Sequence, residues 1–236
     1  MPSRNPSLPR GDLDSVHSST SANTSGSDIA LAMDVPSSDL VSATFGTSDL
    51  LGTLVATTPL ASFPIQNNSF AILSTGRAID ANLPNNSDAL SYELDGLNNS
   101  QGNDLTQLTL RLRVPSNMNC MMTDFVFLSE EFPEFVGSQY NDAFTIEEGG
   151  TNLQISQNQV SAPLNFAYDK GARSISVNTV LGVTPNTGTT YDGATSVLTA
   201  QKRVPSGQTI TVVYSIQDLG DSVYDSAVFL DNFRWS

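Results

Sequence analysis

Acidic and amide side chains gather in two stretches of this sequence, and their oxygen atoms are the ligands that hard cations prefer. The first stretch, 124–145, reads DFVFLSEEFPEFVGSQYNDAFT, and the second, 218–235, reads DLGDSVYDSAVFLDNFRW. Carboxylates held close together repel one another unless a cation offsets their charge. We therefore predict a structural calcium site, with candidate ligands Glu130, Glu131, Glu134, Asn141, Asp142, Asp221, Asp225 and Asp231. The spacing is not that of an EF-hand, and a solvated acidic loop is the alternative.

Asp231 differs from the other candidates because it stands inside an apolar run, AVFLDNF. An ionised carboxylate in such a run is costly unless it is paired, hydrogen-bonded or bound to a metal. Two interpretations therefore stay open for this residue. It either ligates the predicted calcium ion or accepts backbone hydrogen bonds at a β-bulge.

Catalysis by the same carboxylates is not predicted. A glycosidase needs two carboxylates that flank one sugar, whereas Glu130 and Glu131 are adjacent and would point to opposite faces of a strand. The single histidine, His17, lies in the polar N-terminal stretch, which excludes a histidine-dependent mechanism in the folded part. The sequence also contains no nucleophile elbow, P-loop or dinucleotide fingerprint. We predict that the protein is not an enzyme.

Three tyrosines are candidates for ligand binding. Tyr140, Tyr191 and Tyr224 lie in loop-like segments beside glycine, aspartate or asparagine. If their rings are exposed, they offer flat faces on which a sugar can stack. The alternative is that these rings pack the loops.

These residues need a sheet to bring them together. Apolar residues alternate with polar ones over 105–115 and 208–218, which indicates half-buried strands. Further strands are expected at 69–76, 122–128, 142–147, 153–155, 174–180, 194–204 and 227–235. Short strands separated by Gly, Pro and Asn turns predict an all-β, jelly-roll-like antiparallel β-sandwich. A short N-terminal helix is expected near 47–55.

The chain divides into a polar arm and one domain. Residues 1–37 are rich in Ser, Pro, Asn, Thr and Gly and predict a disordered arm or linker, while 38–236 form the β-sandwich domain. The first 28 residues lack the apolar core of a Sec signal peptide. This leaves open a signal outside this sequence, another export route, or release from inside the cell.

The composition limits the partners. The chain of 236 residues has 24 acidic and 10 basic residues and a net charge of −14, which disfavours nucleic acid and anionic membranes. No apolar run reaches the roughly 18 residues of a membrane span. The lone Cys120 excludes an intrachain disulfide and a closed Cys/His zinc site.

Five segments resemble the bacterial choice-of-anchor L domain. They are ILSTG (72–76), GNDL (102–105), SEEFPEFVGSQYNDAF (129–144), YDGATSVLTA (191–200) and DLGDSVYDSAVFLDNF (218–233). The resemblance extends over about residues 39–235 and implies a secreted or surface-displayed bacterial β domain.

Two functions fit these observations. The first is an extracellular or surface-displayed, calcium-stabilised recognition and adhesion module that binds a glycan or another cell-surface ligand. The second is a structural subunit of an extracellular fibre, appendage or particle, in which copies assemble through the N-terminal arm.

Overall fold

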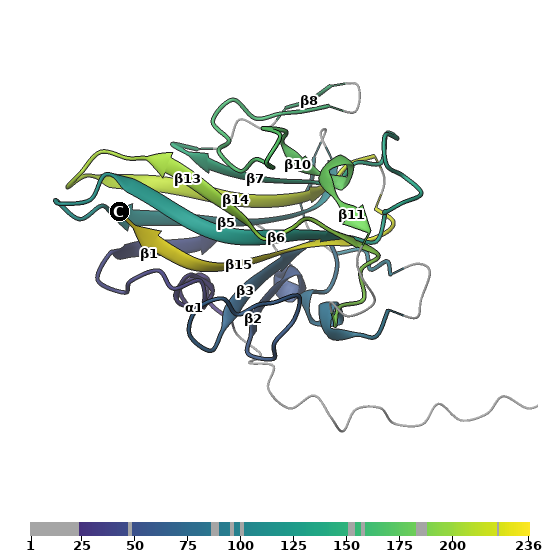
Figure 1. The fold of residues 1–236 in the computed structure, drawn as a ribbon, viewed down its shortest axis with the longest axis horizontal. Helices are drawn as coiled ribbons and strands as arrows, with labels where there is room; N and C mark the ends of the chain where they lie inside the picture. Colours follow the sequence, from purple (N-terminus) through teal and green to yellow (C-terminus); the bar gives the residue numbers. More distant parts are fainter. Residues whose placement is uncertain are drawn as a thin grey trace, which may run out of the picture.

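The protein folds as two antiparallel β-sheets packed face to face in a computed structural model (Figure 1). This confirms the all-β, jelly-roll-like sandwich predicted from the sequence. The structure describes residues 24–46, 49–85, 90–94, 97–99, 102–150, 154–156, 159–182, 188–220 and 222–236. No helix in these ranges is long and apolar enough to cross a membrane.

The first sheet, sheet A, contains six strands among the described residues. Its order is β1-β5-β14-β7-β10, and β4 also pairs with β5. The bounds are β1 Leu40–Phe45, β4 Leu97–Asn99, β5 Gly102–Arg113, β7 Ala143–Glu148, β10 Ile175–Ser176 and β14 Thr209–Asp218. The two long alternating segments of the sequence, β5 and β14, pair with each other in its middle.

The second sheet, sheet B, contains seven strands in the described ranges. Its order is β11-β12-β6-β15-β3-β2, and β13 also pairs with β6. The bounds are β2 Thr53–Ala56, β3 Phe70–Ser74, β6 Cys120–Ser129, β11 Leu181–Gly182, β12 Gly193–Ala194, β13 Leu198–Arg203 and β15 Ser226–Trp235. A separate hairpin pairs β8 (Gln154–Ser156) with β9 (Gln159–Ser161).

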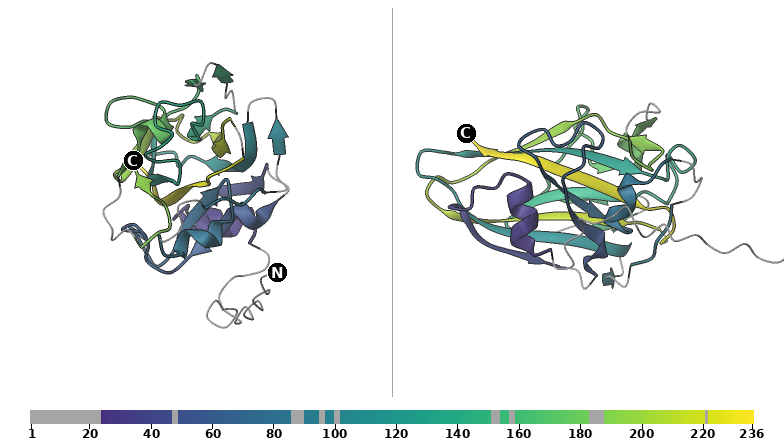
Figure 2. Two further views of the ribbon diagram at one scale, coloured as in Figure 1. Left: turned by 90° about the vertical axis from the view of Figure 1, so that its right-hand side faces the viewer. Right: turned by 90° about the horizontal axis from the view of Figure 1, so that it is seen from below.

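A short helix, α1 (Gly26–Ala32), precedes the first strand and contacts β1, β2 and β3 (Figure 2). Ser25 begins it through a capping box: its Oγ accepts from the Asp28 N–H at 3.2 Å, and its own N–H donates to the Asp28 carboxylate at 2.8 Å. Ile29 and Met33 are fully buried. Residues 24–37 are thus folded, so the boundary predicted at residue 37 falls inside the domain; the rest of the predicted arm lies outside the described residues.

The helix predicted near 47–55 has a different form in the structure. Leu50–Gly52 make one 3₁₀ turn, η1, and Thr53–Ala56 continue as strand β2. Gly52 allows the backbone to pass close to the Thr106 side chain, because a Cβ at this position would lie 2.4 Å from the Thr106 Oγ1. The β-branched residues that follow favour a strand over a helix.

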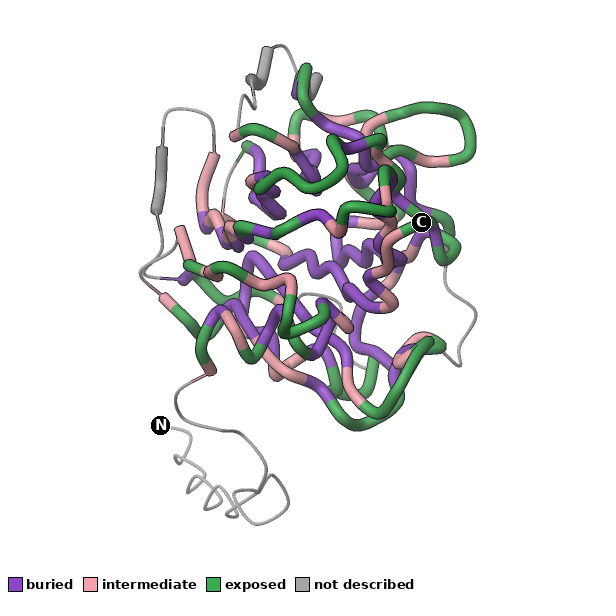
Figure 3. The backbone as a smooth tube through the Cα atoms, turned by 90° about the vertical axis from the view of Figure 1, so that its left-hand side faces the viewer, coloured by how far each residue is buried: buried purple, intermediate pink, exposed green. Residues whose placement is uncertain are grey.

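Two apolar layers hold the sandwich together. The buried residues that form them lie in the interior of the fold, with exposed residues mostly in the outer loops (Figure 3). The larger layer lies between the sheets and includes Phe125, Phe127, Phe144 and Tyr214. The smaller layer covers the outer face of sheet B, where Phe70 packs 5.2 Å from Phe229, measured between ring centroids. Because β6, β15 and β3 are covered on both faces, they read in the sequence as continuous apolar runs.

Candidate functional site

Buried acidic side chains gather where five strands, β5, β6, β7, β14 and β15, begin or end, at the end of the sandwich opposite the C-terminus (Figure 1). Antiparallel pairing explains the gathering: β14 ends where β7 begins, and β6 ends where β15 begins. We call this region the acidic end, defined by Asp104, Glu130, Glu131, Asp142, Asp218 and Asp225. Carboxylates are rarely this buried unless they are paired or bind a metal.

Two members of the acidic end were missed in the sequence analysis. Asp104 belongs to the buried series that alternates along β5, and Asp218 is the last residue of β14; each is 1% exposed. The signal that identifies them is their position in the buried series, which begins at Asp104 in β5 and ends at Asp218 in β14. Each aspartate is therefore buried to the same depth as the core residues of its strand.

Glu131 and Asp142 lie near the two ends of the connection between β6 and β7. The Asp142 Oδ1 accepts from the Leu219 N–H at 3.1 Å, which ties the beginning of β7 to the end of β14. Glu131 follows β6, and its N–H donates to the Ser129 Oγ at 3.1 Å. Both predicted ligands are therefore buried in this region.

Glu130 and Asp225 form the part of the acidic end nearest Tyr191. The Glu130 N–H donates to the Asp225 backbone oxygen at 3.1 Å, and the Leu90 N–H donates to the Glu130 Oε1 at 3.1 Å. The Tyr92 N–H donates to the Asp225 Oδ1, also at 3.1 Å. Residues 90–92 thus lie over both carboxylates.

Asp225 is the most informative member because its two oxygens differ. Oδ1 accepts from the Tyr92 N–H, whereas the buried Oδ2 has no hydrogen-bond partner among the described residues. Gly76 lies against this carboxylate so closely that a Cβ there would fall 1.9 Å from Oδ2. A glycine therefore leaves room for the Asp225 carboxylate, but the described part of the chain supplies no donor to its Oδ2.

The pKa values of two members of the acidic end, Asp225 and Asp104, are raised. Burial is the largest cause and raises the pKa of Asp225 to about 8; the Tyr92 N–H opposes the shift, and the carboxylates of Asp142 and Asp104 add to it. Burial likewise raises the pKa of Asp104 to about 6, with Glu93 as the next contributor. These shifts favour either a proton or a cation at the acidic end.

The donor set suits a hard cation more than a soft one. It consists of carboxylate oxygens with nearby backbone oxygens, the ligand types of Ca²⁺. Within the described ranges, no three His, Cys, Asp or Glu side chains already converge as a metal centre. Backbone or amide oxygens would therefore have to complete the coordination. Asp221, another predicted ligand, lies outside the described residues.

The remaining predicted oxygen ligands are placed differently. Glu134 is exposed in the turn after β6. Asn141 is buried, and its side-chain oxygen accepts from the Asn178 N–H at 3.4 Å. Asn141 thus lies beside Asp142 as predicted, whereas Glu134 points outside the buried group.

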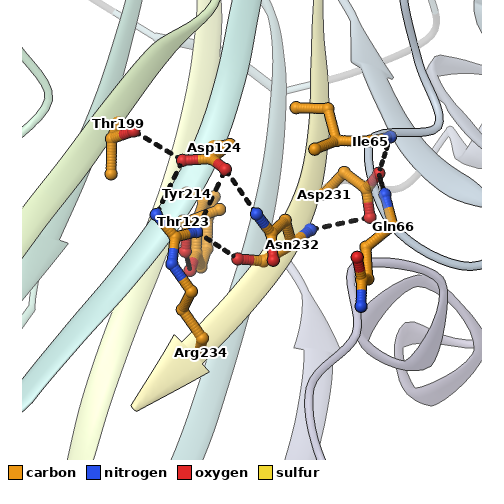
Figure 4. Close-up of polar contacts among 9 residues, drawn as sticks. All are labelled: Ile65, Gln66, Thr123, Asp124, Thr199, Tyr214, Asp231, Asn232 and Arg234. Carbon is orange, nitrogen blue, oxygen red and sulfur yellow. Dashed lines mark hydrogen bonds and ion pairs between the residues drawn. The ribbon is translucent and has the colours of Figure 1, made fainter. Parts of the chain in front are cut away.

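Asp231 lies in the body of sheet B rather than at the acidic end (Figure 4). Its carboxylate accepts from the backbone N–H groups of Ile65, Gln66 and Asn232, at a β-bulge of β15. Burial raises its pKa, the N–H donors oppose the shift, and a hydrogen bond with Asp34 adds to it. The sequence left two interpretations of Asp231 open, and the structure shows the second, in which the carboxylate accepts backbone hydrogen bonds at a β-bulge.

A second polar network in the same figure was not found from the sequence. Asp124 of β6 accepts from the Thr199 Oγ1 and the Asn232 Nδ2, both at 2.6 Å, and pairs with Arg234 at 3.0 Å (Figure 4). We call these four residues the Asp124 network. Its members lie on three neighbouring strands and become adjacent only through the sheet register.

The three candidate tyrosines separate into two kinds. Tyr191 is fully buried in the smaller apolar layer, so its ring is closed to an external ligand, which corrects the prediction for this residue. Tyr140 and Tyr224 are half-buried at the surface beside the acidic end. Both contact the ring of Phe135, with centroid distances of 5.4 Å in each case.

Comparison with known proteins gives a family and several distant folds. The family profile described as Choice-of-anchor L domain matches residues 26–234. TmCBM61, solved with β-1,4-galactotriose, is 8% identical with a TM-score of 0.38, over 84% of this chain and 90% of that one. The K3 adhesin domain of Lys-gingipain from Porphyromonas gingivalis is 12% identical with a TM-score of 0.32, over 84% of this chain and 94% of that one.

A third distant structure is an enzyme domain. The xyloglucanase domain of NopAA from Sinorhizobium fredii is 13% identical with a TM-score of 0.30, over 83% of this chain and 98% of that one. No curated protein matches the sequence. Identities and TM-scores this low carry no inference about ligand or activity.

Proposed function

Because the chain belongs to the Choice-of-anchor L domain family, we propose that it is a secreted or surface-displayed recognition module, stabilised by Ca²⁺ and binding a glycan. The family assignment supports the location. The buried carboxylates support the ion, and the half-buried rings beside them support the ligand class. No catalytic step is proposed, because Glu130 and Glu131 follow the end of β6 at Ser129 and are only 2% and 1% exposed, so neither faces a substrate at the surface.

The single observation that carries the calcium proposal is the buried Oδ2 of Asp225. This oxygen has no hydrogen-bond partner in the described part of the chain, and the residue is 3% exposed. Leaving a buried carboxylate oxygen unsatisfied costs on the order of 1–3 kcal/mol, and more when the group is charged. A bound cation removes that cost and lowers the repulsion among the neighbouring carboxylates.

Calcium fits the site better than the other common cations. Asp225, Glu130 and Asp142 offer hard oxygen donors from three different strand ends. Calcium accepts irregular oxygen coordination, whereas Mg²⁺ requires near-octahedral geometry and zinc favours nitrogen and sulfur. An ion held by these residues would link sheet A to sheet B at their shared end.

The test is thermal unfolding of the full chain after dialysis against a chelator, followed by titration with Ca²⁺. A ligand at 100 times its Kd adds about 2.7 kcal/mol to the native state, which corresponds to a rise in Tm of roughly 5–10 °C for a chain of this size. Mg²⁺ at the same concentration should give a smaller rise. An unchanged Tm in millimolar Ca²⁺ would reject the proposal.

Two variants assign the effect to the site. The Asp225→Asn variant should fold but lose the Ca²⁺-dependent rise in Tm, because the amide removes the negative charge at the residue whose Oδ2 has no donor in the described part of the chain. Asp169→Asn is the matched control, since Asp169 pairs with Arg173 at 2.7 Å on the surface, in a turn between β9 and β10. That variant should keep the full rise.

A further inference from the structure

Three aromatic rings from two loops meet beside the acidic end, two from the connection between β6 and β7 and one from the connection between β14 and β15. Phe135 lies in the turn after β6, Tyr140 precedes β7, and Tyr224 precedes β15. Phe135 contacts Tyr140 edge-on, with 87° between the ring planes, and contacts Tyr224 at a 39° tilt. We call these three residues the aromatic cluster.

The cluster is placed at the surface rather than in a core. All three rings are half-buried, and none belongs to either apolar layer. Two residues next to them in the chain are exposed: Val136 is 46% exposed and Val223 is 42% exposed. Apolar side chains grouped on the surface of a soluble domain mark a binding site more often than scattered ones do.

The backbone around the cluster is held in unusual conformations. Tyr224 has a φ of 69°, a region that is rare for aromatic residues and costs on the order of 1–3 kcal/mol. Gly220 packs against Tyr140, and a Cβ there would fall 2.9 Å from the Tyr140 Cδ1. The Ser138 Oγ accepts from the Tyr140 N–H at 3.0 Å. The rings are therefore positioned before any ligand arrives.

Each ring is also joined to the acidic end through the chain. Tyr224 directly precedes Asp225, and Tyr140 stands two residues before Asp142. The Phe135 N–H donates to the Glu131 backbone oxygen at 3.0 Å. A change at the carboxylates is therefore passed to both loops that carry the rings.

We infer that the aromatic cluster is the ligand-binding surface and that its ligand is an uncharged polysaccharide. This inference rests on the proposed recognition function. Flat rings offer π faces to the C–H groups of a sugar ring, and polar groups at the rim bind its hydroxyls. The acidic surroundings, with exposed Glu134 in the same turn, repel uronates and sulfated sugars.

The size of the cluster favours a sugar chain over a protein partner. A stable protein interface uses about 20–30 residues on each side. The aromatic cluster and its two exposed valines are far fewer residues than such an interface uses. Their number is enough for a few rings to stack on a short stretch of polysaccharide.

The experiment measures binding of the full chain to an array of neutral and anionic glycans, with Ca²⁺ present. We expect binding to at least one neutral glycan and none to uronic-acid polymers. Tyr140→Ala and Tyr224→Ala should each weaken that binding at least tenfold. Tyr168→Ala is the matched control, because Tyr168 is 39% exposed in another loop and should bind as the parent does.

The outcomes separate this inference from the calcium proposal. Both hold if the two tyrosine variants keep the Ca²⁺-dependent rise in Tm but lose the glycan. Glycan binding without any effect of Ca²⁺ rejects the ion and leaves the inference standing. A Ca²⁺ effect with no neutral glycan bound, or full binding by both variants, overturns the inference. Concentration-dependent dimers that Tyr224→Ala abolishes, with no glycan bound, would also overturn it in favour of a contact between copies.

Discussion

The acidic end and the Asp124 network bury carboxylates by two different means. In the network, Asp124 accepts from Thr199 and Asn232 and pairs with Arg234, and nearby Asp231 accepts three backbone N–H groups. At the acidic end, Asp225 has one backbone donor, and its neighbours include other carboxylates. The comparison shows that two carboxylates of similar burial differ in the hydrogen-bond donors that reach them, and the shortage of donors at the Asp225 Oδ2 is what supports the proposed cation site.

The largest expected effect is a loss of stability with rising pH in the absence of calcium. A raised carboxyl pKa means that the folded state holds its proton where the unfolded state has lost it, so the free energy of unfolding falls as pH rises. For Asp225, with a pKa of about 8, the fall from pH 5 to pH 8 is about 4 kcal/mol, at roughly 1.4 kcal/mol per unit.

Urea unfolding of the chelated protein at these two pH values measures this fall. Asp225→Asn should flatten the profile, and added Ca²⁺ should flatten it in the parent chain. Equal stability of the chelated parent at pH 5 and pH 8 would contradict the raised pKa and remove the contrast between the two regions.

The same substitution should have opposite signs in the two regions. Asp124→Asn removes the charge that Arg234 and Asn232 face, and we expect a loss of about 2–3 kcal/mol. Asp225→Asn at pH 8 without calcium removes an unfavourable buried charge and should stabilise by about 2 kcal/mol or more. Chemical unfolding of both variants provides the values. Two losses of similar size would mean that the acidic end is as well supplied with donors as the network.

A smaller loss is expected from Gly76→Ala. Its Cβ would overlap the Asp225 carboxylate, and overpacking of a buried site costs about 1–3 kcal/mol. Gly171→Ala is the control, because its Cβ would approach nothing closer than 3.3 Å, the Asp169 Oδ1. The Tm of each variant, with and without Ca²⁺, tests the close approach. A Gly76→Ala variant with the parent's Tm and calcium response would show that Asp225 moves freely.

The smallest expected effect concerns Asn232→Gly in the Asp124 network. Asn232 has a φ of 52°, which glycine adopts easily, so the variant isolates the loss of the hydrogen bond to Asp124. We expect a loss of about 1 kcal/mol in urea unfolding, because Arg234 and Thr199 remain as donors. A loss as large as that of Asp124→Asn would mean that Asn232 alone holds the carboxylate.

The strands that carry most of the fold were predictable because their apolar runs are long. Cys120–Ser129, Thr209–Asp218 and Ser226–Trp235 each fall within a few residues of the predicted bounds. The first two strands and α1 were missed because each is short, between four and seven residues, and too short to show a clear period. Packing against distant segments decides their form: the Phe233 N–H, for example, donates to the backbone oxygen of Met33.

The candidate site was predictable in its residues more than in its arrangement. Glu130, Glu131, Asp142 and Asp225 are identifiable because they directly follow or precede apolar strands. The hydrogen bonds of Asp231 were not predictable, because two of its donors, Ile65 and Gln66, are 166 and 165 residues away in the chain. Burial of Tyr191 was equally hidden, since its loop looks polar in the sequence.

The position of β15 has a consequence for how the protein is made. This strand, Ser226–Trp235, comes last among those described, yet it lies between β6 and β3 in the middle of sheet B. Until that segment leaves the ribosome, β3 and β6 each present an unpaired edge that invites aggregation. Synthesis and folding are thereby separated in time, because sheet B cannot close until the segment that forms β15 has been made.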